Sequence, residues 1–172
     1  MHTKFRLIFW LMMAVVSQSD ADTSLGEINI ELHGTIVAYS CAAQGGDSNK
    51  SVKMGTWATK QLPAAGSTTP SVPFTLALTG CPPGAASITF SGRSVAGSGL
   101  LALRDSAMAH AVAIEIMDSD RTRLPLEQAS RYVDVDSNGN ATLTFYAHYI
   151  ALTDQVQPGT ADAEATFTIN YY

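Results

Sequence analysis

The sequence predicts an all-β protein built as a sandwich of short strands. Three observations favour this class. Apolar and polar residues alternate in many short runs, and turn residues separate the runs, with 13 Gly and 7 Pro in the chain. Charged residues, which long helices use heavily, make up only 15% of the chain. A length of 172 residues with 46% hydrophobic content suits one packed domain.

The first 21 residues are predicted to be a signal peptide. Lys4 and Arg6 give a basic start, an apolar run follows, and the small residues Ser19 and Ala21 precede a cut after residue 21. The apolar run is about ten residues long, whereas a span of the bilayer needs about 20. A membrane anchor is the alternative. We therefore expect the chain to be exported.

The expected strands follow one another along the rest of the chain. In order, they cover 28–36, 52–56, 72–80, 86–92, 111–117, two strands around the sequence SNGN at 137–140, and a last strand from about 163. Asn138 and Gly139 predict a hairpin, because both residues adopt the left-handed turn conformation easily. Residues 101–110 are the one stretch where a helical turn is expected. These short strands predict a sandwich that is immunoglobulin-like in broad terms.

The two cysteines, Cys41 and Cys81, are predicted to form a disulfide. An isolated pair in an exported chain is most simply explained in this way. The bond would close a loop of 39 intervening residues, which corresponds to roughly 4 kcal/mol in the chain-entropy model. Two cysteines without nearby histidines cannot complete a zinc site, and a catalytic cysteine needs a base partner.

No catalytic or metal-binding set is predicted. His33, His110 and His148 are isolated on different strands, without the spacing of metal ligands. The sequence DVDSNG at 134–139 resembles the start of a calcium loop, but Phe145 stands where such a loop requires a glutamate. We therefore expect neither an enzyme nor a bound cofactor.

The net charge is -5, and the chain has no basic cluster. Nucleic acid needs grouped Lys and Arg to neutralise its phosphates, so it is not expected as a partner.

Both ends of the expected mature chain carry well-patterned strands. The last one places Ala165, Phe167, Ile169 and Tyr171 on one face, and an alternating strand also precedes Cys41. Long apolar edge strands invite pairing with another chain. The alternative is that both strands belong to a closed sandwich.

The residues resemble a pilin subunit of chaperone–usher fimbriae of the type 1 pilus kind, over about residues 25–172. The sequence GTIVAYSC leads into the first cysteine and LTGCP surrounds the second, as in that family. Gly159 is fourteenth from the end of the sequence, and Tyr171 is the penultimate residue. These two positions are family marks.

The resemblance implies an incomplete immunoglobulin-like β-sandwich, residues 35–172, that lacks its last strand. A donor strand from another chain would complete it, entering a groove lined by Phe167 and Ile169. A periplasmic pilus chaperone would first donate that strand, and its basic cleft would hold the carboxylate of Tyr172. Gly159 and Tyr171 are assigned to the same chaperone and groove site.

Residues 22–34 are, by this resemblance, an N-terminal extension that completes a neighbouring pilin subunit. Its inserting face is Ile28, Ile30 and Leu32, with Gly34 beyond. Burial of three such side chains contributes roughly 5–9 kcal/mol. Gly26 also lies on this face, and gapless counting puts Ile28 where the family has a glycine, so the register stays open.

The function implied is that of a structural subunit, in the rod or as a minor or adaptor pilin, in a fimbria that serves bacterial adhesion. The implied partners are the periplasmic chaperone, the outer-membrane usher and neighbouring pilin subunits. Export through the periplasm and assembly on the cell surface follow from this reading. The alternative is a stand-alone secreted β-sandwich binding domain.

Overall fold

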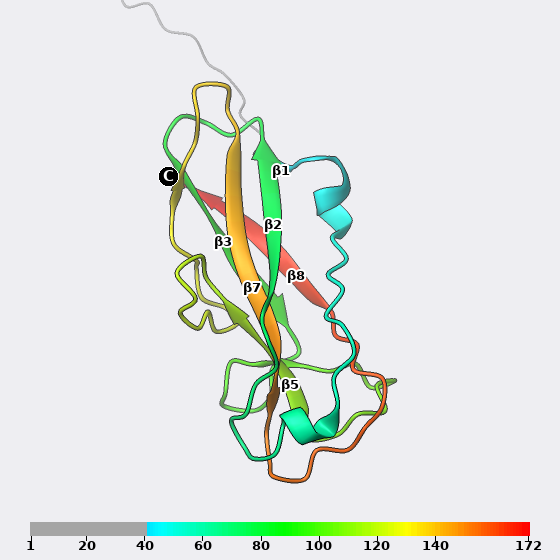
Figure 1. Ribbon diagram of the computed structural model, residues 1–172. Coiled ribbons are helices and arrows are strands. Elements are labelled where there is room, and N and C mark those ends of the chain that lie inside the picture. Colours follow the sequence, from blue (N-terminus) through cyan, green and yellow to red (C-terminus); the bar gives the residue numbers. More distant parts are fainter. Residues whose placement is uncertain (1–40) are drawn as a thin grey trace, which may run out of the picture. The chain divides into compact units, whose positions relative to one another are not determined.

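The computed structural model describes residues 41–172 (Figure 1). The predicted signal peptide and donor extension, with Ile28, Ile30, Leu32 and Gly34, lie outside the described residues. Within residues 41–172, no helix is both long enough and apolar enough to cross a membrane.

The described residues form two antiparallel sheets. Strands β1 (Ala42–Ala43), β2 (Val72–Thr79), β7 (Ala141–Ala151), β5 (Val112–Met117) and β4 (Leu101–Ala102) form one sheet in that order. Strands β6 (Val133–Asp134), β3 (Ala85–Gly92) and β8 (Ala165–Tyr171) form the other. Two 3-10 helices, η1 (Gly45–Asn49) and η2 (Thr59–Gln61), lie between β1 and β2. The predicted all-β sandwich is confirmed.

The core lies between the two sheets because alternate residues of each strand point inward. Leu76 on β2, Phe145 on β7 and Ile88 on β3 are at most 1% exposed. The ring of Phe90 packs edge-on against that of Phe145, with 5.0 Å between ring centroids. Aromatic packing across the two sheets therefore centres the core on β2, β3 and β7.

The predicted disulfide between Cys41 and Cys81 is confirmed. Cys41 directly precedes β1, and Cys81 lies between β2 and β3. The bond therefore ties the first described residue to the connection between the two sheets.

The hairpin predicted at Asn138–Gly139 is wrong, although the turn itself forms. The Asp136 N–H donates to Asn140 O at 2.8 Å, and Gly139 has φ of 78°. However, β6 pairs with β3, whereas β7 pairs with β2 and β5. The chain changes sheet at this turn, so that the apolar residues of β6 and β7 cover the same core from opposite sides.

Two other expectations need correction. Val52 and Met54 alternate with exposed residues as predicted, but 52–56 pairs with no strand in the described part of the chain. Residues 101–110 begin with the short strand β4, which was not expected; the expected helical turn corresponds to one isolated turn, in which Ala107 N–H donates to Arg104 O.

Candidate functional site

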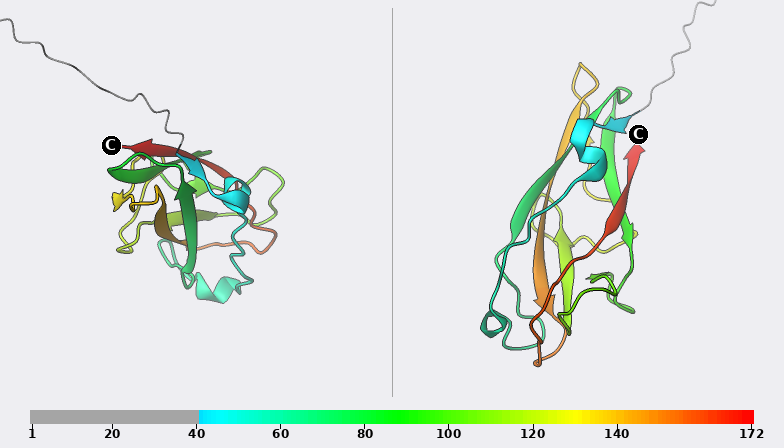
Figure 2. Two further views of the ribbon diagram at one scale, coloured as in Figure 1. Left: turned by 90° about the horizontal axis from the view of Figure 1, so that it is seen from above. Right: turned by 90° about the vertical axis from the view of Figure 1, so that its right-hand side faces the viewer.

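Strand β8 is the edge of the three-stranded sheet. Its partner β3 pairs with it from Gly92↔Ala165 to Ala86↔Tyr171. No strand of the described residues pairs with its other side, which we call the β8 edge. The left view in Figure 2 shows β8, in red, along the upper margin of the sandwich.

The backbone of the β8 edge offers hydrogen-bonding groups to a further strand. Tyr172 and Ala85 exchange two hydrogen bonds, of 3.0 and 3.2 Å. In an antiparallel ladder every second pair does so, which turns Thr166, Thr168 and Asn170 toward β3. The intervening residues are Ala165, Phe167, Ile169 and Tyr171, and their N–H and C=O groups point away from β3. Within residues 41–172 these groups have no backbone partner.

The side chains of Ala165, Phe167 and Ile169 pack against the core but are only partly covered, whereas that of Tyr171 is exposed. Phe167 is half-buried, whereas Phe90, directly opposite it on β3, is 6% exposed. Ile169 is also half-buried, whereas its partner Ile88 is fully buried. The β8 edge therefore combines an apolar row with an unpaired backbone.

Other apolar residues of the core, outside β8, are also only partly covered. Phe74 on β2 and Met54 in the preceding segment are half-buried and pack against the same core as Phe167. The ring of Phe74 lies 6.1 Å from that of Phe90. Sequence reasoning did not assign Phe74 or Met54 to the site, because alternation alone does not identify which inward side chains stay uncovered.

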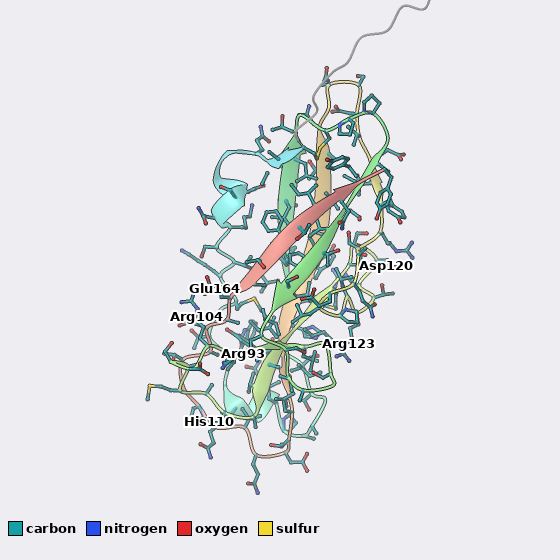
Figure 3. All side chains as sticks on the ribbon, turned by 180° about the vertical axis from the view of Figure 1, so that it is seen from behind. Arg93, Arg104, His110, Asp120, Arg123 and Glu164 are labelled. Atoms are coloured by element: carbon teal, nitrogen blue, oxygen red, sulfur yellow. A yellow bond between two sulfur atoms is a disulfide. The ribbon has the colours of Figure 1, made fainter. Side chains whose placement is uncertain are left out.

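Charged pairs flank the start of β8. Arg104 contacts Glu164 at 2.7 Å, and Arg93 pairs with Asp105. Figure 3 shows Arg93, Arg104 and Glu164 gathered there. These exposed pairs contribute little to stability. They mark a polar end to the apolar row.

At the other end of β8, the side chains of Tyr171 and Tyr172 are 52% and 65% exposed. The ring of Tyr132 packs edge-on against that of Tyr172, at 4.9 Å between centroids. Gly84 lies beside them, and a side chain there would overlap the carbonyl oxygen of Tyr172. The sequence analysis selected Tyr171 and Tyr172 but missed Tyr132 and Gly84.

Gly159 lies in the connection from β7 to β8, six residues before Ala165, and is not part of the β8 edge. A side chain at this position would overlap the backbone of Met108 and Ala109. The N–H groups of these two residues both donate to Thr160 O, at 3.0 and 2.9 Å. The glycine therefore permits close contact between two loops.

The remaining polar residues considered from the sequence hold the scaffold together. Asp136 accepts from the N–H groups of Asn138 and Asn140 at 2.8 and 2.9 Å, and the bond from Asn140 is the main reason that its pKa is lowered. His148 contacts Glu115 at 2.7 Å. No group of three or more potential metal ligands occurs within residues 41–172.

These features define a class of protein: a β-sandwich whose edge strand carries a partly covered apolar row and backbone groups without a partner in residues 41–172. The chain belongs to the fimbrial protein family, whose model matches residues 30–172.

Individual relatives agree with this family. Fimbrial-like protein FimF of Salmonella typhimurium is 65% identical over 153 residues, which cover 89% of each chain. The type-1 fimbrial protein A chain of Escherichia coli is 32% identical over 162 residues, or 88% of each chain. The crystal structure of the P pilus rod subunit PapA shares the fold, with a TM-score of 0.64 over 77% of this chain and 99% of that one, at 18% identity.

Proposed function

We propose that this protein is a structural subunit of a chaperone–usher fimbria and that a strand donated by another polypeptide completes its sandwich along β8. The single observation that carries the proposal is the β8 edge. There, partly buried apolar side chains and unpaired backbone groups occur together on Ala165, Phe167 and Ile169, and the unpaired backbone continues to the exposed Tyr171. A paired strand would satisfy both needs at once. The type-1 fimbrial relatives support this assignment.

The N-terminal extension of a neighbouring subunit is the proposed final donor. In this chain the corresponding stretch, Ile28–Gly34, has seven residues, and β8 also has seven. Ile28, Ile30 and Leu32 alternate with polar residues, as a strand with one buried face requires. The extension of this chain would in turn complete the next subunit. Folding and burial supply the free energy of assembly.

Before assembly, an uncovered β8 edge is an aggregation hazard. A periplasmic chaperone is proposed to cover it with a strand of its own, and a basic cleft of that chaperone binds the end of β8 at Tyr172. An outer-membrane usher then exchanges the chaperone for the next subunit. The product is a surface fimbria that serves adhesion.

Removal of residues 22–33 tests the donor role. The shortened subunit keeps its β8 edge, so it should still co-purify with the chaperone, but it should fail to extend a fibre. A matched pair of variants replaces either Ile30 or the neighbouring Asn29 by Asp, and the Asn29 variant is the control. Ile30→Asp should block polymerisation and Asn29→Asp should not, because only Ile30 lies on the inserting face. Normal fibres from the deletion would refute the proposal.

Substitution of Tyr171 tests the acceptor side. Tyr171→Ala should lower the yield of chaperone co-purified with the subunit, because its backbone and its half-exposed ring lie on the β8 edge. Tyr146→Ala is the control, because Tyr146 lies on β7 in the other sheet. There the guanidinium carbon of Arg121 lies 4.4 Å from the centroid of the Tyr146 ring. An equal chaperone yield from both variants would count against a role for this end of β8.

A further inference from the structure

Exposed aromatic side chains gather at the end of β8. Tyr132, Tyr171 and Tyr172 are between 52% and 65% exposed, and Met108 is the one other large apolar residue of residues 41–172 with comparable exposure. Tyr132 directly precedes β6, so β3 separates it from β8. The three tyrosines therefore lie at the same end of one sheet, and two of them, Tyr132 and Tyr172, are in contact.

The geometry of the sheet explains how Tyr132 reaches Tyr172. Val133 and Tyr171 both pair with Ala86, which is fully buried, so both face the core. Their neighbours Tyr132 and Tyr172 consequently point to the outer face. There the two rings meet across β3 at 4.9 Å, with an interplanar angle of 86°. This is a favoured edge-to-face arrangement.

Gly84 and Ser87 are two further residues that allow close packing between the end of β8 and β3. Gly84, with φ of 138°, leaves room for the backbone of Tyr172. Ser87, whose side chain also points outward, is nevertheless fully buried, and its hydroxyl has no hydrogen-bond partner in the described part of the chain. Side chains on the outer face therefore cover the sheet where β3 passes between the tyrosines.

We propose that Tyr132 is a positioning residue for the β8 edge. Its ring contact with Tyr172 across β3, which we call the tyrosine clasp, keeps the backbone of Tyr171 aligned for a partner strand. The inference rests on the proposed function, because it names what holds the acceptor strand in register. An edge strand with a single neighbour tends to open from its end. The clasp opposes this opening where Tyr171 offers the last unpaired N–H and C=O groups.

The chemistry of the pair is consistent with close contact. Hydrogen bonding to the phenol of Tyr172 is the main cause that raises the pKa of Tyr132, and the charge of that phenol adds to it. The ring contact itself supplies the clasp, so the phenylalanine variant should retain it.

Hydrogen exchange at the Tyr172 amide, which donates to Ala85 O, tests the clasp without any partner. In the mature, disulfide-bonded subunit, Tyr132→Ala should speed this exchange about fivefold, the range expected for loss of an aromatic pair. Tyr132→Phe should stay within about twofold of the wild type, as should Tyr146→Ala on the other sheet. An unchanged Tyr172 exchange rate in Tyr132→Ala overturns the proposal.

Binding of a synthetic peptide of residues 25–36 tests what the clasp does for a partner strand. Tyr132→Ala should raise the dissociation rate of the peptide about fivefold, and the same change made in a Tyr172→Ala background should have little further effect. Faster exchange with unaltered peptide dissociation would overturn the positioning role. If the wild type binds no donor strand of any kind, the proposed function fails, whereas the exchange measurement still decides whether the clasp exists.

Discussion

Strands β3 and β8 belong to the same ladder and face the same core, yet they differ in what covers them. On the side of β3 away from β8, Ile88 N–H donates to the Ser130 hydroxyl at 3.0 Å, and Ile88 O accepts from Ser130 N–H at 2.8 Å. Strand β8 has β3 alone. The inward side chains Ile88 and Phe90 of β3 are buried, whereas Phe167 and Ile169 of β8 are only partly buried. Burial in this sandwich thus follows the completeness of the sheet more than the apolar character of the residue.

The largest expected effect comes from truncating one ring on each strand. Phe90→Ala should destabilise the subunit by about 3–5 kcal/mol, as for a buried aromatic residue. Phe167→Ala, directly opposite, should cost roughly half as much, because its ring is only partly buried. Urea unfolding of the oxidised mature subunit measures both. Equal losses would remove the distinction between the two strands.

Backbone amides should show the same contrast within β8. The N–H groups of Phe167 and Ile169 point to the open side, and those of Thr168 and Asn170 point to β3. We expect exchange of the first pair to be faster by about 100-fold, because only the second pair needs local opening. Hydrogen exchange followed by NMR resolves each amide. A bound donor peptide should slow the first pair selectively, and uniform protection along β8 in its absence would contradict an open edge.

Substitution of Ser130 removes a hydrogen bond on the side of β3 that faces away from β8. Ser130→Ala leaves the N–H of Ile88 without its acceptor in a buried setting, which should cost about 1–3 kcal/mol. The midpoint of chemical unfolding reports this loss. Ser137→Ala, in an exposed turn, should stay within about 0.5 kcal/mol of the wild type. A comparable shift in both variants would show that the hydroxyl of Ser130 is not what completes β3.

The smallest effect concerns the loop that carries Ser130. Asp120 accepts hydrogen bonds from Thr122 and from Arg131, and these partners, Thr122 first, lower its pKa from 3.8 to about 2. A lowered pKa in the folded state gives stability that is present above pH 3.8 and is lost as the pH falls to about 2. Asp120→Asn should therefore lower Tm at neutral pH, and the deficit should vanish near pH 2. A deficit of the same size at both pH values would exclude this linkage.

The sequence predicted which side chains of β3 and β8 face the core, but not why those of β8 are less buried. Alternation located the inward faces of β3 and β8 correctly, including Phe90 and Phe167, because side-chain direction has a period of two. It could not assign β6 and β7 to different sheets, since the turn at Asn138–Gly139 is compatible with either partner.

The candidate site was predicted only in part, because sequence patterns do not show which distant residues come into contact. Tyr171 was selected through a family mark, and Tyr172 through the carboxylate that, by the resemblance, a chaperone would hold. Tyr132 was not, because its contact with Tyr172 depends on β3 passing between two strands that are distant in sequence. The donor residues 28–34 remain predictions, as do the roles assigned to the β8 edge.

The disulfide has a mechanical consequence. Tension applied through the segment that precedes Cys41 passes across the covalent bond to Cys81, at the junction of β2 and β3. Strand β1, with only two paired residues, is thereby shielded from the load. In a subunit with reduced cysteines the same pull would peel β1 away first, so stretching under a force probe should lengthen the chain at lower force than in the oxidised form.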